Sequence, residues 1–385
     1  MRDAGATAVL YPVGKLGAEA GSVAVTMHDV AQRAGVSIKT VSNVVNGYPY
    51  IRAATKERVE SAIEDLGYRV NMSARNLRTR RTGLITLAVP ELSLPYFAEL
   101  ADAVISAADA AGWTVLIEQT SASRERETEV LSGRRRHLTD GLIFSPLALG
   151  PDDVDLFTVD FPLVLLGERV FGAPADHVTM NNVAAAKAAT LHLASLGRRR
   201  IAVIGAHEEE QVGSAALRTA GYREGLAEAG LPYAPELVGE AGLWHRSTGA
   251  ETMSRMLDDG VEIDAVFALN DALALGALHA LHARGVDVPG DVALMGFDDV
   301  DDAKYSVPAL SSVDPGRDQI AHTAVELLLE RIGTSGVGDP APFRKVVPDS
   351  RIVGRESTGD VETGRAERVV GTQKGGIERV AVPGG

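Results

Sequence analysis

The chain has 385 residues, which leaves room for a small module and about two domains of ordinary size. Hydrophobic residues make up 45% of the chain, so substantial cores can form, and the net charge is −14. Cysteine is absent and no apolar stretch reaches membrane-spanning length, which excludes disulfides, thiolate metal sites, a catalytic thiol and a membrane-spanning helix.

Residues 1–25 are expected to form a disordered arm, or an extension translated from an upstream start codon. Lys15 and Glu19 interrupt the apolar residues of this segment, so no secretory signal peptide is expected. The lack of a signal peptide and of cysteine together favours a cytoplasmic location.

Residues 26–47 are predicted to form two short helices joined by a tight turn. Thr26 and Asp29 have the spacing of a capping box that opens the first helix. Gly35 ends this helix, and Ser37 can cap the second. Apolar residues form a seam between the two helices: Val30, Ala31, Ala34, Val36, Val41 and Val45.

The second helix carries Lys39, Ser42 and Asn43 at i, i+3 and i+4, on the face opposite the apolar seam. A cation, a hydroxyl and an amide on one exposed helix face can read base edges in a DNA major groove. The alternative is an ordinary helical hairpin with solvated polar residues.

The charge distribution favours DNA binding. Residues 26–82 hold ten Lys and Arg against five Asp and Glu, although the whole chain is strongly acidic. A basic amino-terminal module on an acidic body is expected where one end of a protein meets phosphates.

Residues 55–66 are predicted to form a third helix, which ends at Gly67. Residues 71–80 are polar and basic and contain Leu77 as a large apolar residue. Such a linker can be disordered when free and helical on DNA.

After Gly83, short apolar strands alternate with helices, a pattern typical of parallel sheets covered by helices. This number of units predicts two sheets rather than one. The predicted strands are residues 84–89, 113–118, 141–144, 163–166, 201–204, 265–269 and 292–297, and the helices are 96–111, 184–196, 216–229 and 272–284. Residues 358–385 lack periodicity and are expected to be a disordered tail.

Polar side chains follow two of these strands. Asn270 and Asp271 come directly after one strand, and Asp298 directly after another. Ligand sites in this architecture lie beyond the carboxyl ends of the strands. The alternative for Asp271 is that it caps the following helix.

Motifs for catalysis and for cofactors are missing from the sequence. It contains no phosphate-binding P-loop, no G-x-G-x-x-G after a strand, no H-E-x-x-H and no G-x-S-x-G. The nine histidines lack metal-ligand spacing. We therefore expect neither an enzyme nor a cofactor or metal site.

An ordered series of motifs resembles the lactose/galactose-repressor (LacI/GalR) family of transcription regulators over about residues 26–357. The most specific block is D-V-A-Q-R-A-G-V-S-I-K-T-V-S at 29–42. Others are V-N-G at 45–47, L-G-Y at 66–68, A-R-N-L-R at 74–78, R-T-A-G-Y at 218–222, N-D-A-L-A-L-G at 270–276, V-P-G-D-V at 288–292 and G-F-D-D at 296–299.

The resemblance implies an all-α helix-turn-helix headpiece at residues 26–70 and a hinge helix at 71–82. It implies an α/β periplasmic-binding-protein-like core at 83–357, built from two doubly wound parallel-sheet subdomains. The first subdomain would comprise about 83–183 plus 316–343, and the second about 184–315 plus 344–357.

The resemblance also implies site residues. In the DNA-binding part, Ile38, Lys39, Ser42 and Asn43 match base-reading positions, and Leu77 matches a leucine that wedges into the minor groove. The other predicted DNA contacts are Thr26, Thr40, Asn46, Arg75 and Arg78, the last two as phosphate contacts. The alternatives are that Leu77 only packs against its dimer mate and that the arginines form a solvated face.

The predicted effector-binding residues are Tyr96, Phe97, Arg218, Trp244, Asn270, Asp271 and Asp298. Charged and amide groups suit the hydroxyls of a sugar, and an indole ring suits its C–H face. The sequence thus favours a sugar effector, with a purine or nucleoside as the alternative. Tyr96 and Phe97 have core packing as their alternative role.

The predicted function is a cytoplasmic, nucleoid-associated repressor that binds a palindromic operator as a homodimer under the control of a small effector. The rival class is a periplasmic-type solute-binding protein with the same core. That class would require a secretion signal and no headpiece, and the sequence goes against both.

Overall fold

A computed structural model describes residues 25–45, 48–68, 81–133, 138–207, 210–335 and 341–359, and the backbone of Glu367–Val369 and Glu378–Arg379. The chain divides into two compact units, residues 1–80 and 81–385. Within the described residues, no helix combines the length and the apolar character that a membrane crossing requires.

The first unit is helical. Its helices are α1 (Met27–Ala34), α2 (Ile38–Val45) and α3 (Ala53–Leu66). The predicted capping is confirmed: the Thr26 hydroxyl accepts a hydrogen bond from the Asp29 amide at 3.4 Å, and the Asp29 carboxylate accepts one from the Thr26 amide at 2.8 Å. Gly35 ends α1 with a left-handed φ of 66°, and the Ser37 hydroxyl accepts from the Thr40 amide at 3.1 Å.

An apolar seam holds these helices together. Val30, Val41 and Val59, one from each helix, are fully buried. Burying three such side chains contributes about 1.5–3 kcal/mol apiece relative to leaving them exposed. Arg33 and Asp65 also connect α1 to α3 at 2.8 Å, but both side chains are about half exposed, and such pairs contribute little.

The second unit begins with a mostly parallel sheet, which we call the sheet of the first subdomain. Its strand order is β14-β11-β5-β4-β3-β1-β2, in which only β14 runs antiparallel to its neighbour. The strands are β1 (Leu84–Val89), β2 (Thr114–Gln119), β3 (Leu142–Phe144), β4 (Leu163–Leu166), β5 (Asp176–Val178), β11 (Arg344–Val346) and β14 (Glu378–Arg379).

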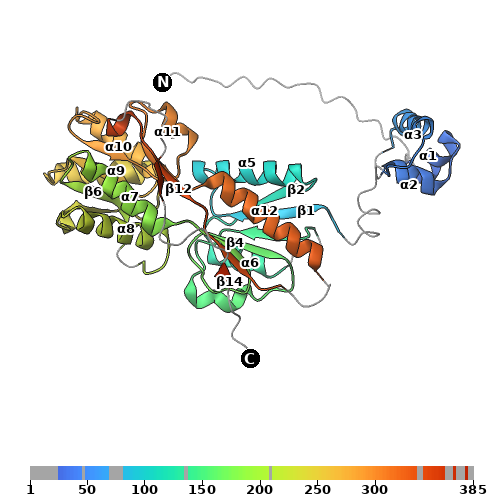
Figure 1. The fold of residues 1–385 in the computed structure, drawn as a ribbon, viewed down its shortest axis with the longest axis horizontal. Coiled ribbons are helices and arrows are strands. Elements are labelled where there is room, and N and C mark those ends of the chain that lie inside the picture. Colours follow the sequence, from blue (N-terminus) through green and yellow to red (C-terminus); the bar gives the residue numbers. More distant parts are fainter. Residues whose placement is uncertain are drawn as a thin grey trace, which may run out of the picture. The chain divides into compact units, whose positions relative to one another are not determined.

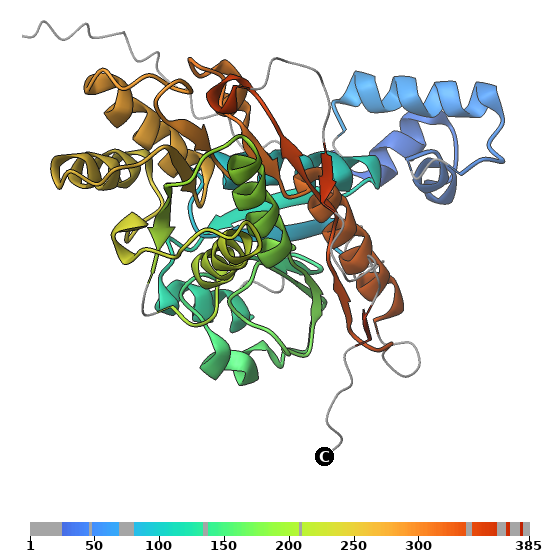
Figure 2. The same ribbon diagram turned by 60° about the vertical axis from the view of Figure 1, so that its left-hand side comes forward.

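Helices cover both faces of the inner strands of this sheet, because β1, β3 and β4 are apolar on both sides. Ile85 and Leu87 of β1 pack with α5 (Pro95–Ala110) and α12 (Arg317–Thr334), which lie beside each other (Figure 1 and Figure 2). Ala88, on the opposite face of β1, packs with α6 (Arg124–Leu131) and the 3₁₀ helix η1 (Pro151–Phe157).

The second subdomain repeats this plan with a parallel sheet of order β7-β6-β8-β9. One face carries α7 and α8 and the other carries α9 and α10 (Figure 1). Its elements are α7 (Asn182–Ser195), β6 (Ile201–Ala206), α8 (Ser214–Glu228), η2 (Pro235–Leu237), β7 (Val238–Glu240), α9 (Arg246–Asp258), β8 (Ala265–Ala268), α10 (Asp271–Ala283), β9 (Ala293–Met295) and α11 (Asp301–Tyr305).

A third, antiparallel sheet has the order β10-β12-β13. Its strands are β10 (Ser312–Asp314), β12 (Ser350–Val353) and β13 (Glu367–Val369), and the 3₁₀ helix η3 (Glu356–Thr358) follows β12. Up to residue 359 the described chain therefore crosses between the subdomains after β5, after β10 and after β11, the three crossings that the family resemblance implies.

Two predicted boundaries differ from the structure. Residues 344–346 were assigned to the second subdomain, but Lys345 pairs with His177 and Val346 with Val178 in the first sheet. The last crossing therefore comes a few residues later. The predicted disordered tail also contains two short strands, β13 on β12 and β14 on β11. They pair there because β12 and β11 would otherwise present unpaired backbone edges.

Candidate DNA-reading face and ligand cavity

The second helix of the first unit, α2, presents the predicted DNA-reading face. Ile38 is 48% exposed and Lys39 is also exposed, whereas Thr40 and Asn43 are half-buried. Ser42 is only 7% exposed, so its predicted place on the exposed face is wrong. The helix packs against both α1 and α3, and this two-sided contact turns Ser42 inward.

The other predicted DNA contacts divide into two groups. Thr26 is exposed, but its hydroxyl also belongs to the capping box of α1, and the Thr40 hydroxyl lies 2.9 Å from that of Ser37. The remaining predicted contacts lie outside the described residues: Asn46, Arg75, Leu77 and Arg78.

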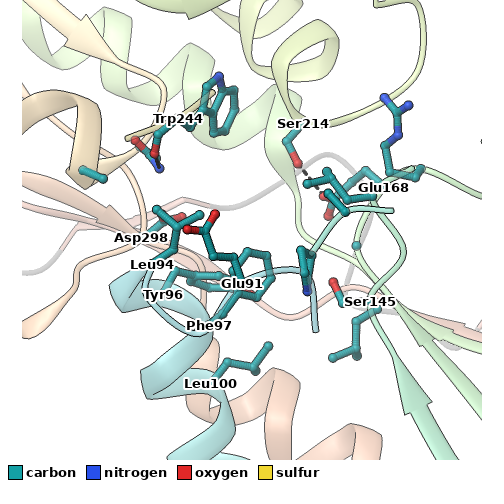
Figure 3. Close-up of a pocket in the computed structure, with 18 of the residues that line it drawn as sticks. Glu91, Leu94, Tyr96, Phe97, Leu100, Ser145, Glu168, Ser214, Trp244 and Asp298 are labelled. Atoms are coloured by element: carbon teal, nitrogen blue, oxygen red, sulfur yellow. Dashed lines mark hydrogen bonds between the residues drawn. The ribbon is translucent and has the colours of Figure 1, made fainter. Parts of the chain in front are cut away.

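A cavity of about 580 Å³ lies between the two subdomains of the second unit. Figure 3 shows residues of both subdomains around it: Glu91 and Phe97 come from the first subdomain, and Trp244 and Asp298 come from the second. Of the seven predicted effector-binding residues, six line this cavity: Tyr96, Phe97, Arg218, Trp244, Asn270 and Asp298. The carboxyl ends of parallel strands meet here, which is why separate segments contribute.

Arg218 is a fixed part of the cavity wall, and its side chain is only 3% exposed. Its Nε donates to Asn182 Oδ1 at 2.7 Å, and its Nη1 donates to the Leu269 carbonyl. The guanidinium stacks on the Phe297 ring, with its carbon 3.5 Å from the ring centroid. These contacts hold the guanidinium rigidly while Nη1 remains 3.6 Å from Asp298 Oδ1.

Asp298 contributes a carboxylate to the cavity wall. It is 6% exposed, yet within the described residues its carboxylate accepts no hydrogen bond. Burial raises its pKa to about 7, although Arg218 and Arg317 oppose this shift. Its backbone adopts a φ of 115°, a rare conformation for a residue other than glycine and one that clusters at ligand sites.

Asn270 and Asp271 have different roles, although they are adjacent. The Asn270 side chain caps α10 by accepting from the Leu273 amide at 2.8 Å, and its amide donates to the Trp244 carbonyl at 3.2 Å. Asp271 does not line the cavity, so its predicted effector contact is not supported. Its carboxylate accepts from the Val300 amide at 2.9 Å and from the Ser312 hydroxyl at 2.6 Å.

Aromatic rings form the apolar part of the wall. Tyr96 and Phe97 meet edge to face at 5.2 Å, and Phe97 also packs on the core of the first subdomain. The Trp244 indole donates to the Gly205 carbonyl at 3.0 Å, which fixes the ring beside the cavity. The two aromatic residues at the start of α5 therefore line the cavity and pack on the core at once.

Sequence reasoning missed several polar residues of the wall. Glu91 comes two residues after β1, and Glu168 comes two residues after β4. Ser145 directly follows β3. The rule that located Asn270 and Asp298, a polar residue just beyond a strand end, applies to all three and would have found them.

Polar contacts also connect the two subdomains around the cavity. The contacts are His245 Nε2 with Glu91 Oε2 at 2.9 Å, the Ser214 hydroxyl donating to Glu168 Oε2 at 2.8 Å, Arg169 Nη1 with Glu210 Oε2 at 3.3 Å, and the Asp301 amide donating to Glu99 Oε1 at 2.8 Å. These contacts connect the two subdomains at the rim and wall of the cavity.

Comparison with known proteins places both units in one family. Residues 26–71 match the bacterial regulatory proteins of the lacI family, and residues 190–358 match a periplasmic binding protein-like domain. The transcriptional regulator AscG of Escherichia coli K12 is 34% identical over 292 residues, which cover 75% of this chain and 86% of AscG. The chain belongs to the lacI family of bacterial transcription regulators.

Solved structures agree with this family assignment. A LacI-family regulator structure from Sanguibacter keddieii is 55% identical with a TM-score of 0.68, covering 73% of this chain and all of that one. The regulator CelR in complex with cellobiose is 31% identical (TM-score 0.62; 86% and 99% covered). The Lac repressor dimer bound to operator and the anti-inducer ONPF is 26% identical (TM-score 0.73; 87% and 99% covered).

This family assignment confirms the fold and the general function predicted from the sequence. A helix-turn-helix unit precedes an α/β core of two parallel-sheet subdomains, as in the Lac repressor structure. The relatives named above are transcriptional regulators. This chain is accordingly a DNA-binding transcription regulator.

Proposed function

We propose that this LacI-family regulator is a repressor that binds a palindromic operator as a homodimer. A sugar that occupies the cavity lowers or raises the affinity of the protein for this operator. One headpiece spans about half an operator, so a two-fold dimer suits a palindrome. The Lac repressor, a relative, is a dimer on its operator. A regulator of this kind acts at the nucleoid in the cytoplasm.

The observation that carries the sugar assignment is the Asp298 carboxylate. It lines the cavity beside Arg218 and accepts no hydrogen bond within the described residues, so its oxygens keep acceptor capacity for a ligand. The Tyr96 and Ser145 hydroxyls also line the cavity and make no hydrogen bond within the described residues. A ligand rich in hydroxyl groups satisfies both acceptors and donors of this kind.

The aromatic geometry also favours a sugar over a purine. A flat base stacks best between roughly parallel rings, but Tyr96 and Phe97 lie at 73° to each other. Trp244 supplies a single ring, which suits the C–H face of a pyranose. The relative CelR binds cellobiose, and a cavity of about 580 Å³ falls within the usual size range of ligand sites.

Effector control requires two core conformations with different affinities for the ligand. The ligand would contact both subdomains, because the cavity wall comes from both. Closure around the ligand shifts the first subdomain relative to the second, and residues 71–80 connect the core to the headpiece. The sugar thereby changes the spacing of the two headpieces in a dimer.

A ligand screen followed by DNA binding tests this proposal. Thermal-shift measurements with neutral mono- and disaccharides and with purines should give a hit among the sugars, because a ligand at about 100 times its Kd adds about 2.7 kcal/mol of stability. That sugar should then change operator affinity in fluorescence anisotropy. A purine that binds and changes operator affinity, with every sugar inert, would contradict the sugar assignment.

A further inference from the structure

The cavity wall contains more negative than positive groups. Among the described lining residues, the carboxylates are Glu91, Glu168, Glu210 and Asp298, and the guanidinium groups are Arg169 and Arg218. An anion-binding site needs a cation or backbone amide whose hydrogen-bonding capacity is still available. The decisive question is therefore whether either arginine is available to a ligand.

Both guanidinium groups already have acceptors. Arg218 donates to Asn182 and to the Leu269 carbonyl, and its remaining Nη2 lies 3.4 Å from the Met180 sulfur. Arg169 Nη1 donates to the Val212 carbonyl at 3.0 Å and lies 3.3 Å from Glu210 Oε2. Arg218 thus directs its donors to protein atoms. Arg169 Nε has no hydrogen-bond partner but is itself buried, and Glu210 balances the charge of this guanidinium group.

The two histidines that line the cavity also have carboxylate partners within the protein. His207 Nε2 donates to the Ala241 carbonyl at 2.5 Å, and its Nδ1 lies 3.2 Å from Glu210 Oε2. His245 Nε2 lies 2.9 Å from Glu91 Oε2. Even a charged histidine at either place would balance a carboxylate that is already present.

Glu168 is the lining carboxylate without a close ion-pair partner, although the charge of Arg218 acts on it from farther away. It is only 4% exposed, and its oxygens accept from the Thr179 hydroxyl at 3.1 Å, the Met180 amide at 2.9 Å and the Ser214 hydroxyl at 2.8 Å. Within the described residues it makes no ion pair. Figure 3 shows it at the cavity wall, on the side opposite Asp298.

We infer that the cavity excludes anionic ligands, so the effector carries no phosphate or carboxylate group, and that Glu168 is the residue that enforces this selectivity. The physical reason is like-charge repulsion in a site shielded from water, where charges interact strongly. This inference rests on the proposed effector site but not on the effector being a sugar. Phosphorylated sugars, sugar acids and nucleotides are all excluded.

Paired ligands give the first test. Calorimetry would compare cellobiose with cellobionate, glucose with glucose 6-phosphate, and adenosine with adenosine monophosphate. For any pair that binds, the charged member should bind at least about a hundredfold more weakly, because juxtaposed like charges cost several kcal/mol. A charged member that binds as well as or better than its neutral parent would overturn the inference.

Quenching of Trp244 fluorescence gives a second test that needs no known ligand. In a Trp113→Phe background, Trp244 is the remaining tryptophan of the chain and lines the cavity. At constant ionic strength, anionic iodide should quench it much less than neutral acrylamide does. Equal quenching by the two would overturn the inference even if no ligand were found.

Two substitutions make this test specific to Glu168. Glu168→Gln keeps an oxygen acceptor for the neighbouring hydroxyls, and it should raise iodide quenching while leaving acrylamide quenching unchanged. Glu262→Gln is the matched control, because the Glu262 side chain is 86% exposed and Glu262 does not line the cavity. Equal iodide quenching in both variants would show that Glu168 does not set the selectivity.

The results can distinguish a failure of the exclusion of anions from a failure of the sugar assignment. If neutral purines bind and sugars do not, the sugar assignment fails while the exclusion of anions stands. If a sugar phosphate binds better than its parent sugar, the sugar assignment stands and the exclusion of anions fails.

Discussion

At the scale of single residues, the hydrogen-bond partners of a buried carboxylate determine its role. Asp298 and Asp271 are both buried carboxylates near strand ends. Asp271 accepts two hydrogen bonds that hold the segment around Val300 and Ser312, whereas Asp298 accepts none from the described residues and lines the cavity. The same residue type therefore serves structure in one place and lines the cavity, where we propose that it binds the ligand, in the other.

We predict that sugar affinity increases as the pH rises through the pKa of Asp298. Burial raises this pKa to about 7, and the charged groups that act on it are Arg218, Arg317, Glu168 and Glu99. Sugar hydroxyls donate to the ionised carboxylate, so the ligand favours ionisation and binding releases a proton near neutral pH. Calorimetry in buffers of different ionisation enthalpy measures that proton release.

The matched variant for this prediction is Asp298→Asn. It should bind the sugar roughly tenfold or more weakly, since hydrogen bonds to charged groups contribute about 1.5–3 kcal/mol. Its affinity should also lose the pH dependence and the proton release. Retention of the same proton release would assign it to another group and contradict the role of Asp298.

We predict that Lys39→Ala weakens binding to the specific operator by about 1–3 kcal/mol and changes binding to random DNA little. The reason is that Lys39 lies on the exposed face of α2. Lys56→Ala is the control, because Lys56 is an exposed lysine on α3 that pairs with Glu60 at 3.7 Å. Equal losses for both variants in fluorescence anisotropy would show that α2 does not read bases.

At the scale of elements, paired helices on each face of the second sheet keep the cavity wall in place. The tightest approach is between α9 and α10, where a Cβ on Gly276 would lie 2.0 Å from the Arg246 carbonyl oxygen. Helix α10 begins beside Asn270, and α9 begins two residues after Trp244. The spacing of this helix pair thus determines where two cavity residues lie.

We predict that Gly276→Ala destabilises the core by about 1–3 kcal/mol or more, because backbone atoms must move apart. The control is Gly333→Ala on α12, where an added Cβ meets nothing within 4 Å. There alanine should stabilise the helix by up to about 1 kcal/mol. Denaturant unfolding measures both effects, and an unchanged midpoint for Gly276→Ala would refute the close packing of α9 on α10.

At the scale of the whole molecule, the chain is arranged so that one ligand contacts both subdomains. The crossings after β5, β10 and β11 bring separate segments into each subdomain, and polar contacts such as His245–Glu91 join the two across the cavity. A ligand that favours the closed arrangement can therefore act on the whole core, and through residues 71–80 on the headpiece.

We predict that the protein is a dimer in solution, because a palindromic operator requires two headpieces related by a two-fold axis. The carboxyl-terminal residues contain no leucine heptad that would join dimers into a tetramer. Light scattering should give twice the mass of one chain. A stable tetramer would show that a surface of the core, rather than the tail, sets the assembly.

The sequence alone determined the features that depend on local patterns. Capping residues located α1 and α2, and apolar patterns located seven strands and the helices α3, α5, α7, α8 and α10 to within two residues, but helices such as α9 and α12 were not predicted. Strand-end polarity located Asn270 and Asp298. These predictions succeed because each depends on residues that are neighbours in the chain.

Only the tertiary structure decided which side chains are buried and which distant segments meet. Ser42 is turned inward by contacts on two sides, and β11 joins the first sheet through a partner strand that lies far away in the sequence. The hydrogen bond from the Ser214 hydroxyl to Glu168 likewise joins two segments that are distant in the sequence. Such long-range contacts leave no local pattern, since they depend on how complete elements pack together.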